Sequence, residues 1–218
     1  MEKIIIQHVS KRFKSLLALN DVSVSFETGK IYGLIGRNGS GKTMLMRIIC
    51  GLAAPTEGTV IVNGKKLGID IDVPESIGAI IESPGFLPNK TGYENLKYLA
   101  SLREKPDREK IEKTIQKCGL DPHSKKIVGK YSLGMKQRLG IAQAIMDDPD
   151  ILILDEPMNG LDNQGVEDVK KLLKEMRSAG KTIVIASHHM EDIAELCDTV
   201  YTMENGCLRE GRGLDAKR

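Results

Sequence analysis

One eight-residue segment constrains this chain more than any other. Gly36-Arg37-Asn38-Gly39-Ser40-Gly41-Lys42-Thr43 has the pattern G-x-x-x-x-G-K-[ST]. It follows an apolar segment, residues 30–35, that is typical of a strand, and it leads into residues 42–50, whose apolar side chains have helical spacing. A strand, a glycine-rich turn and a helix start are the local structure that such a loop requires.

This segment is predicted to bind the phosphates of a nucleotide. Small residues allow consecutive backbone N–H groups to point at phosphate oxygens, and a helix start adds partial positive charge. Lys42 can reach the β- and γ-phosphates, and the Thr43 hydroxyl can bind Mg²⁺. A chance match of the four fixed positions is the alternative, and the flanking strand and helix patterns argue against it.

Two acidic residues end another apolar run. Residues 151–154 are typical of a strand buried in a parallel sheet, and Asp155 and Glu156 follow directly. Ligands of open α/β sheets bind at the carboxyl ends of strands. Asp155 is therefore expected to hold Mg²⁺, and Glu156 to polarise the attacking water or accept its proton. A solvated acidic turn is the alternative, and the phosphate loop upstream favours the catalytic interpretation.

A pair of histidines follows the next buried strand. Residues 182–186 form a further apolar run, and Ser187, His188 and His189 come after it. A neutral imidazole at this place could bond both the γ-phosphate and water. A lone histidine is more often structural, and the local pattern does not choose between His188 and His189.

The remaining pattern predicts an α/β core with an inserted helical lobe. Strand and helix patterns alternate in the last third, strands and turns dominate the first third, and residues 91–146 have helical patterns. Thr91 and Glu94 fit a capping box at the start of that block. We expect the lobe to span 84–148, and the rest of the domain to span 1–83 and 149–218.

Composition excludes several classes of function. The 218 residues carry 32 basic and 30 acidic side chains, a net charge of +2 that is too balanced for nucleic-acid binding by bulk attraction. The longest stretch without Asp, Glu, Lys or Arg has nine residues, whereas a bilayer span needs about 18 apolar residues, so we expect no membrane span. The four cysteines lack zinc-site spacing and are typical of reduced thiols in a cytosolic protein.

The order of these motifs resembles that of the ATP-binding cassette ATPases, the nucleotide-binding subunits of ABC transporters. The deciding segment is Tyr131-Ser132-Leu133-Gly134-Met135-Lys136-Gln137-Arg138, which is similar to the LSGGQ signature of that family and lies about twenty residues before Asp155. The resemblance covers nearly the whole chain. It implies a P-loop NTPase core with a mixed, mainly parallel sheet, an N-terminal antiparallel β subdomain and an inserted α-helical subdomain.

The resemblance also implies a site shared by two chains. Two copies would dimerise around two ATP molecules, each held between one chain's phosphate loop and the other's signature segment. Ser132 and the backbone of Gly134 would contact the γ-phosphate across the interface, with a plain helix N-cap as the alternative for Ser132. The segment Asn159-Gly160-Leu161-Asp162 resembles the loop that couples the two sites. Phe13 matches the aromatic residue that stacks on adenine, with a core Phe as the alternative.

Alignment with the family pattern resolves the histidine and exposes one departure. The family's switch histidine corresponds to His188. Glu82 stands where the family usually has a Gln that touches Mg²⁺ and the transmembrane partner. Because Glu is nearly isosteric with Gln, we expect Glu82 still to bind Mg²⁺ and to face the partner, with a surface Glu as the alternative. Three signature positions also differ from the family, but Ser132 and Gly134 remain, so we expect an active site.

Glu82 and the form of the signature resemble one branch of the family, the bacterial exporters that give self-resistance to bacitracin and lantibiotics. The resemblance implies an ATPase, with ATP and Mg²⁺ as cofactors, that powers a separate transmembrane permease docked near Glu82. The working pair would be two copies of this chain or this chain with a similar one. The resemblance places it in the cytoplasm, peripheral on the inner face of the bacterial membrane.

Two other classes of ATPase are weighed against the transporter subunit. A soluble ATPase of the same superfamily in DNA repair or translation is the main alternative. Repair members insert long coiled coils and translation members carry two cassettes, and 218 residues have room for neither. A P-loop kinase or other NTPase would lack the signature segment.

Overall fold

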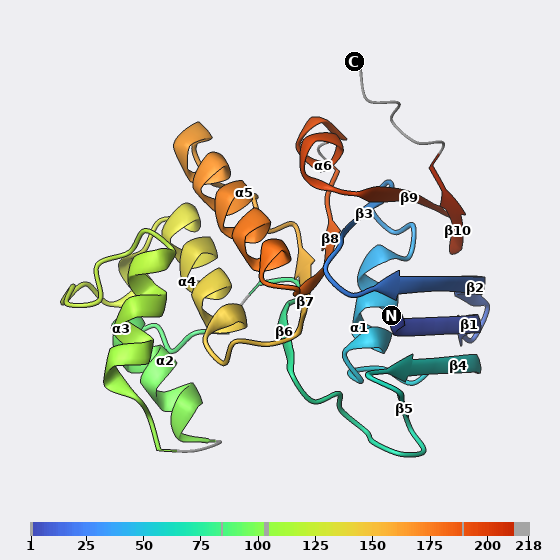
Figure 1. Cartoon of the computed structure of the whole chain (residues 1–218), viewed down its shortest axis with the longest axis horizontal. Coiled ribbons are helices and arrows are strands. Elements are labelled where there is room, and N and C mark those ends of the chain that lie inside the picture. Colours follow the sequence, from blue (N-terminus) through green and yellow to red (C-terminus); the bar gives the residue numbers. More distant parts are fainter. Residues whose placement is uncertain (1, 84, 103–104, 189, 212–218) are drawn as a thin grey trace.

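A six-stranded sheet forms the centre of the fold in the computed structural model, which describes residues 2–83, 85–102, 105–188 and 190–211 (Figure 1). Its strands are β3 (Ile31–Ile35), β6 (Ile77–Ile80), β7 (Ile151–Asp155), β8 (Thr182–Ala186), β9 (Thr199–Glu204) and β10 (Cys207–Glu210). Their spatial order is β10-β9-β3-β8-β7-β6. Neighbours from β9 to β6 are parallel, and β10 pairs antiparallel with β9. The predicted mixed, mainly parallel sheet is confirmed.

The central strands are buried on both faces, which explains their uninterrupted apolar sequences. In β7, Ile151 and Ile153 pack on one face of the sheet, and Leu152 and Leu154 pack on the other. All five residues of β8 are likewise buried. Because side chains alternate between faces along a strand, such a strand needs apolar residues at every position rather than at every second one.

A second sheet packs over one face of the first, with a helix between them. It is antiparallel, in the order β2-β1-β4-β5, and consists of β1 (Glu2–Phe13), β2 (Leu16–Glu27), β4 (Glu57–Val62) and β5 (Lys65–Lys66). Helix α1 (Lys42–Ile49) lies between the sheets in Figure 1. Its Leu45 shares a core with Phe26 of β2 and Val184 of β8. The expected N-terminal antiparallel part is confirmed.

The other helices pack in the core on the opposite face of the central sheet. They are α2 (Gly92–Ser101), α3 (Arg108–Lys117), α4 (Leu133–Ile145), α5 (Asn163–Ser178) and α6 (Met190–Leu196), with a short 3-10 helix at Val128–Lys130. Helices α2, α3 and α4 gather at one side of the molecule in Figure 1. The Thr91–Glu94 capping box is present as predicted. The lobe boundaries at 84 and 148 stay a prediction, and residue 84 itself lies outside the described residues.

Side-chain caps set where three further helices begin. Asp107, Ser132 and Asp162 precede α3, α4 and α5, and each side chain accepts a hydrogen bond from a backbone N–H in the first turn. Within the described residues, no helix is both long enough and apolar enough to cross a membrane.

The double-sided burial of the central strands predicts a large cost for truncating one of their side chains. We expect Leu152→Ala, at a fully buried position, to lower the free energy of unfolding by about 2–5 kcal/mol, because it leaves a cavity between the sheet and the helices. Urea titration followed by circular dichroism measures this change. The control is Ile69→Ala at a residue that is 72% exposed, for which we expect less than about 0.5 kcal/mol. Equal effects of the two changes would contradict the packing described.

Candidate active site

Four loops meet at one edge of the central sheet because four of its strands run parallel and in step. Leu34 of β3 pairs with Ala186 of β8, Ala186 pairs with Asp155 of β7, and Leu154 of β7 pairs with Ile80 of β6. The carboxyl ends of these strands are therefore level. The phosphate loop, the segment with Glu82, the two acids of β7 and the segment after β8 all begin there.

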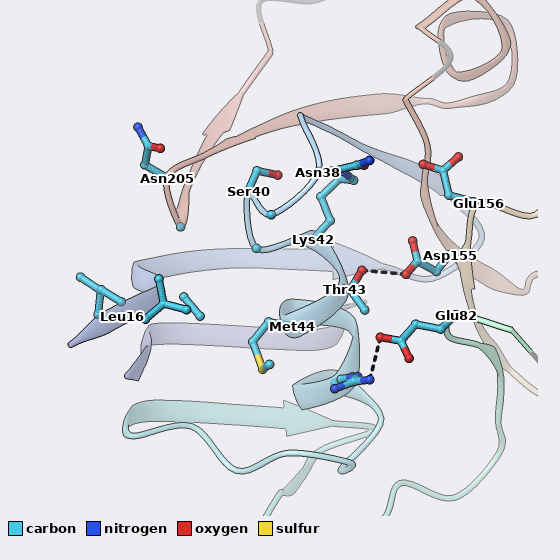
Figure 2. A pocket seen from close by; sticks show the side chains of 16 residues that line it. Leu16, Asn38, Ser40, Lys42, Thr43, Met44, Glu82, Asp155, Glu156 and Asn205 are labelled. Carbon is cyan, nitrogen blue, oxygen red and sulfur yellow. Dashed lines mark hydrogen bonds and ion pairs between the residues drawn. The ribbon is translucent and has the colours of Figure 1, made fainter. Parts of the chain in front are cut away.

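A cavity with a volume of about 580 Å³ lies at this edge. It is lined by Leu16, Leu17, Ala18, residues 38–44, Arg47, Glu82, Asp155, Glu156, Asn205 and Gly206. In Figure 2 the three carboxylates lie at one end of the cavity, and Leu16 and Asn205 lie at the opposite end. The cavity thus has a charged end and a less polar end, joined by the glycine-rich loop.

The glycine-rich loop needs its small residues because the backbone packs closely there. Gly41 caps α1 with a φ of 115°, and a Cβ at that position would come within 2.7 Å of the carbonyl oxygen of Ala18. Lys42 is buried, and its ammonium donates to the carbonyl oxygens of Gly36 and Arg37 at 2.7 and 3.3 Å. The Lys42 side chain thus extends across the loop to its first residues, as expected of an ammonium group that binds phosphate oxygens.

Gly36 and Arg37 occupy the other side of the same loop. They line a second hollow of about 410 Å³ with residues 38–40 and residues 202–205 of the β9–β10 hairpin. Of the sequence-predicted phosphate loop, the structure therefore brings residues 38–43 to the large cavity and turns the first two residues toward the hairpin.

One hydrogen bond ties the start of α1 to the end of β7. The Thr43 hydroxyl donates to Asp155 Oδ2 at 2.8 Å (Figure 2). Burial raises the pKa of the Asp155 carboxyl, and the nearby carboxylates of Glu156 and Glu82 raise it further, against the Thr43 hydrogen bond and the Lys42 charge. The structure thus concentrates negative charge at one point beside the phosphate loop.

This concentration of oxygen atoms suits a magnesium ion. The Thr43 hydroxyl, the buried Asp155 carboxylate and the Glu82 carboxylate line the same end of the cavity. Mg²⁺ prefers oxygen ligands, keeps several waters and binds through one or two carboxylates together with phosphates. Across the described residues, no cluster of three or more His, Cys, Asp or Glu side chains forms a metal cage. Thr43 and Asp155 fit an ion that nucleotide phosphates also hold.

Glu156 has an unusual backbone and a carboxylate with two partners. Its φ of 50° lies in the left-handed region that non-glycine residues rarely adopt. Its N–H donates to the carbonyl oxygen of Ala186, and its own carbonyl oxygen accepts from the Gln137 side chain at 3.1 Å. Ser187 Oγ donates to Glu156 Oε2 at 3.3 Å, and His188 Nδ1 lies 2.8 Å from Oε1. Position 189, the other histidine candidate, lies outside the described residues.

Glu82 is held by a partner that the sequence pattern did not indicate. Arg47 Nη2 lies 2.7 Å from Glu82 Oε1, the second dashed pair in Figure 2. Arg47 stands on α1 one helical turn after Thr43, and both Arg47 and Glu82 line the cavity. The only sequence signal for Arg47 is its position four residues after Thr43, which places both on the same face of the predicted helix.

Phe13 does not line the cavity. It ends β1 and is 46% exposed, and the Lys11 ammonium lies 4.9 Å from the centre of its ring. Phe13 pairs with Leu16 across the β1–β2 hairpin, and it is Leu16, with Leu17 and Ala18, that lines the less polar end. Stacking of adenine on Phe13 stays a prediction.

The signature segment and the predicted coupling loop lie against each other, outside the cavity lining. A Cβ on Gly134 would come within 2.8 Å of the Gly160 carbonyl oxygen, and a Cβ on Gly160 would collide with the side chain of Leu133. Ser132 accepts from the N–H of Met135 at 3.2 Å and so caps α4, and its contact with a partner's nucleotide stays a prediction. Asp162 likewise caps α5. These segments do not complete the cavity of their own chain.

Sequence reasoning missed several cavity residues. Leu16, Leu17 and Ala18 come from a hairpin, Asn205 and Gly206 come from the turn of another, and Arg47 comes from α1. Asn205 and Gly206 lie beside the phosphate loop, where the Gly206 N–H donates a backbone hydrogen bond to the Ser40 carbonyl oxygen.

Comparisons with known proteins agree with this geometry. A family model described as ABC transporter matches residues 19–159. The chain is 45% identical to an uncharacterized ABC transporter ATP-binding protein of Bacillus subtilis, YybJ, over 97% of each chain. It is 43% identical to the bacitracin transport ATP-binding protein BcrA of Enterococcus faecalis, covering 94% of this chain and 67% of that one. It is 36% identical to the lantibiotic transport ATP-binding protein SrtF of Streptococcus pyogenes, covering 95% and 87%.

Solved structures give the same result. A nucleotide-free ATP-binding cassette from an ABC transporter is 27% identical, with a TM-score of 0.85 over 98% of this chain and 92% of that one. A bacterial ABC transporter cassette solved as a dimer is 24% identical, with a TM-score of 0.86 over 95% and 97%, and supports the fold alone.

The raised pKa of Asp155 predicts a pH-dependent change in stability. Because the folded-state pKa lies above the unfolded one, the charged carboxylate destabilises the fold at neutral pH. We expect Asp155→Asn to raise the thermal unfolding midpoint of the nucleotide-free chain by about 2–4 °C at pH 7. The gain should disappear as the pH falls through the folded pKa toward the unfolded value of about 3.9, where the wild-type carboxyl is protonated.

Scanning calorimetry in metal-free buffer over a pH series measures this difference. Asp72→Asn, at an exposed position, serves as the control and should show no such dependence. An Asp155→Asn chain that is less stable than wild type at pH 7 would contradict the argument.

Proposed function

Because the chain belongs to the ABC transporter family, as an ATP-binding and ATP-hydrolysing transporter subunit, we propose that it hydrolyses ATP with the residues gathered at the charged end of the cavity. The observation that carries this assignment is the position of Glu156. Its carboxylate is held by Ser187 and His188 beside the Thr43–Asp155 pair, at the end of the phosphate loop.

The phosphate loop binds the triphosphate in this proposal. Backbone N–H groups at the start of α1 point to the phosphates, and Lys42 exchanges its carbonyl partners for β- and γ-phosphate oxygens. Thr43 and Asp155 would hold Mg²⁺, which would offset the charge of the phosphates. The adenosine lies toward the less polar end, near Leu16 and Asn205.

Hydrolysis follows from the acid next to the metal position. Glu156 orients a water and accepts its proton as the water oxygen attacks the γ-phosphorus, and the bond to the bridging oxygen breaks to leave ADP and phosphate. His188 and Ser187 fix the direction of the Glu156 carboxylate. In this proposal the His188 imidazole also bonds the γ-phosphate.

The site is completed by a second chain. Ser132 and Gly134 lie at the exposed start of α4, outside the cavity lining, so they are free to meet the γ-phosphate of a partner's ATP. A helix N-terminus supplies the same anion-binding groups there as at the phosphate loop. Asp162, at the end of the loop that touches Leu133 and Gly134, links the two sites. The working unit is a homodimer or a pair with a similar ATPase chain.

The unit drives a separate transmembrane permease from the inner face of the cell membrane, and its cargo is an antimicrobial peptide of the bacitracin or lantibiotic type. The names of two relatives, a bacitracin and a lantibiotic transport ATP-binding protein, support this cargo class. The Glu at position 82 supports the same branch. The permease docks at the segment that follows Glu82, which joins the central sheet to α2.

Removing the proposed general base separates binding from hydrolysis. We expect Glu156→Gln to bind ATP with wild-type affinity, to lose about 10²–10⁴-fold in hydrolysis rate, and to accumulate as an ATP-bound dimer. Phosphate release and light scattering coupled to size-exclusion chromatography measure the two effects. Glu57→Gln, at an exposed residue of β4, is the matched control. Hydrolysis by Glu156→Gln at the wild-type rate would exclude Glu156 as the base.

The cargo class is tested in cells. A strain that lacks this gene should become more sensitive to bacitracin or to a nisin-like lantibiotic, and its sensitivity to an antibiotic with an intracellular target should stay unchanged. The wild-type chain should restore resistance, and the Glu156→Gln chain should not. Unchanged sensitivity to both peptides would move the cargo to another class and leave the ATPase assignment intact.

A further inference from the structure

The ion pair between Arg47 and Glu82 joins two parts of the chain that meet at the charged end of the cavity. Arg47 belongs to α1, the helix that the phosphate loop begins, and Glu82 follows the edge strand β6. Their side chains are 38% and 61% exposed, so the pair itself adds little to the stability of the fold. Its location, rather than its strength, is what requires an explanation.

The charges around the pair supply that explanation. Glu82 is the third carboxylate at this end of the cavity, after Asp155 and Glu156, and its charge contributes to the raised pKa of Asp155. A triphosphate would add further negative charge at the same place. An uncompensated Glu82 would repel the phosphates of metal-free ATP and attract a divalent cation. Glu82 also has a φ of 60°, so its backbone conformation is a strained one that local contacts must hold.

We propose that Arg47 is the positioning residue that permits a carboxylate at position 82. Its guanidinium, which comes from one helical turn after Thr43, neutralises Glu82 and holds the carboxylate beside the proposed metal position. The Arg47–Glu82 pair is then electrically equivalent to a neutral side chain facing the nucleotide. This inference rests on the proposed binding of ATP and Mg²⁺ in the cavity.

The proposal predicts two effects of opposite sign. Arg47→Met should weaken the binding of ATP in excess EDTA by about fivefold, because the bare Glu82 carboxylate repels the phosphates. The same change should lower the Mg²⁺ concentration that half-saturates binding of a non-hydrolysable imido analogue of ATP, also by about fivefold, because the released carboxylate attracts the cation. Damage to the local fold would instead weaken both kinds of binding.

The second variant tests whether the effect depends on Glu82. Glu82→Gln alone should shift both quantities in the opposite directions, since it leaves Arg47 without its partner. The double variant Arg47→Met with Glu82→Gln should return both close to the wild-type values, and Arg47→Lys should stay near wild type. Isothermal titration calorimetry on the full chain gives the dissociation constant in EDTA, and a Mg²⁺ series with the analogue gives the metal dependence.

A matched ion pair provides the control. Arg108 and Glu112 on α3 are also 2.7 Å apart and lie outside the cavity lining, so Arg108→Met with Glu112→Gln should change neither quantity. The proposal is overturned if Arg47→Met weakens both kinds of binding. It is also overturned if adding Glu82→Gln to Arg47→Met fails to return both quantities toward their wild-type values. A failure of the proposed function is detected separately. If Glu156→Gln hydrolysed ATP at the wild-type rate, the role of Glu156 would be wrong, but the binding measurements on Arg47 and Glu82 would be unaffected.

Discussion

The parallel pairing of β3, β8, β7 and β6 is the constraint on which the rest of the structure depends. Hydrogen bonding in register brings their carboxyl ends level, so that loops from distant parts of the chain start at one edge. Thr43 and Asp155 are 112 residues apart in sequence, yet they share a hydrogen bond of 2.8 Å.

The sequence predicted the parts of the fold whose signal is local. The apolar runs of β7 and β8, the capping box at Thr91 and the phosphate loop all depend on residues within a few positions of one another. The strands β6 and β1 were among those not predicted. The strand β6 has four residues, one of them a glycine, and β1 is interrupted by register shifts and by His8 at a φ of 52°. Neither shows a clean alternation of apolar and polar residues.

The site residues also divide into those that a local motif predicted and those that depend on tertiary packing. Lys42, Thr43, Asp155, Glu156 and His188 belong to motifs, and sequence placed each at the end of a strand or the start of a helix. No local pattern predicted the cavity walls at Leu16 and Asn205 or the contact of Arg47 with Glu82. These features depend on how distant elements pack against one another. The hairpin that carries Phe13 presents Leu16 to the cavity, and the stacking of adenine on Phe13, which only the resemblance implied, stays a prediction.

Two acids that line the cavity have unusual backbone conformations, and they show how the fold holds a reactive arrangement. Glu82 and Glu156 both have positive φ values, which cost energy that surrounding contacts must offset. At Glu156 these contacts come from β8 through the carbonyl oxygen of Ala186, and from α4 through the Gln137 side chain. Gln137 lies five residues after Ser132 on the same helix. The backbone of the proposed base is therefore fixed directly to the helix that the signature segment begins, so the position of α4 and the geometry of hydrolysis are set together.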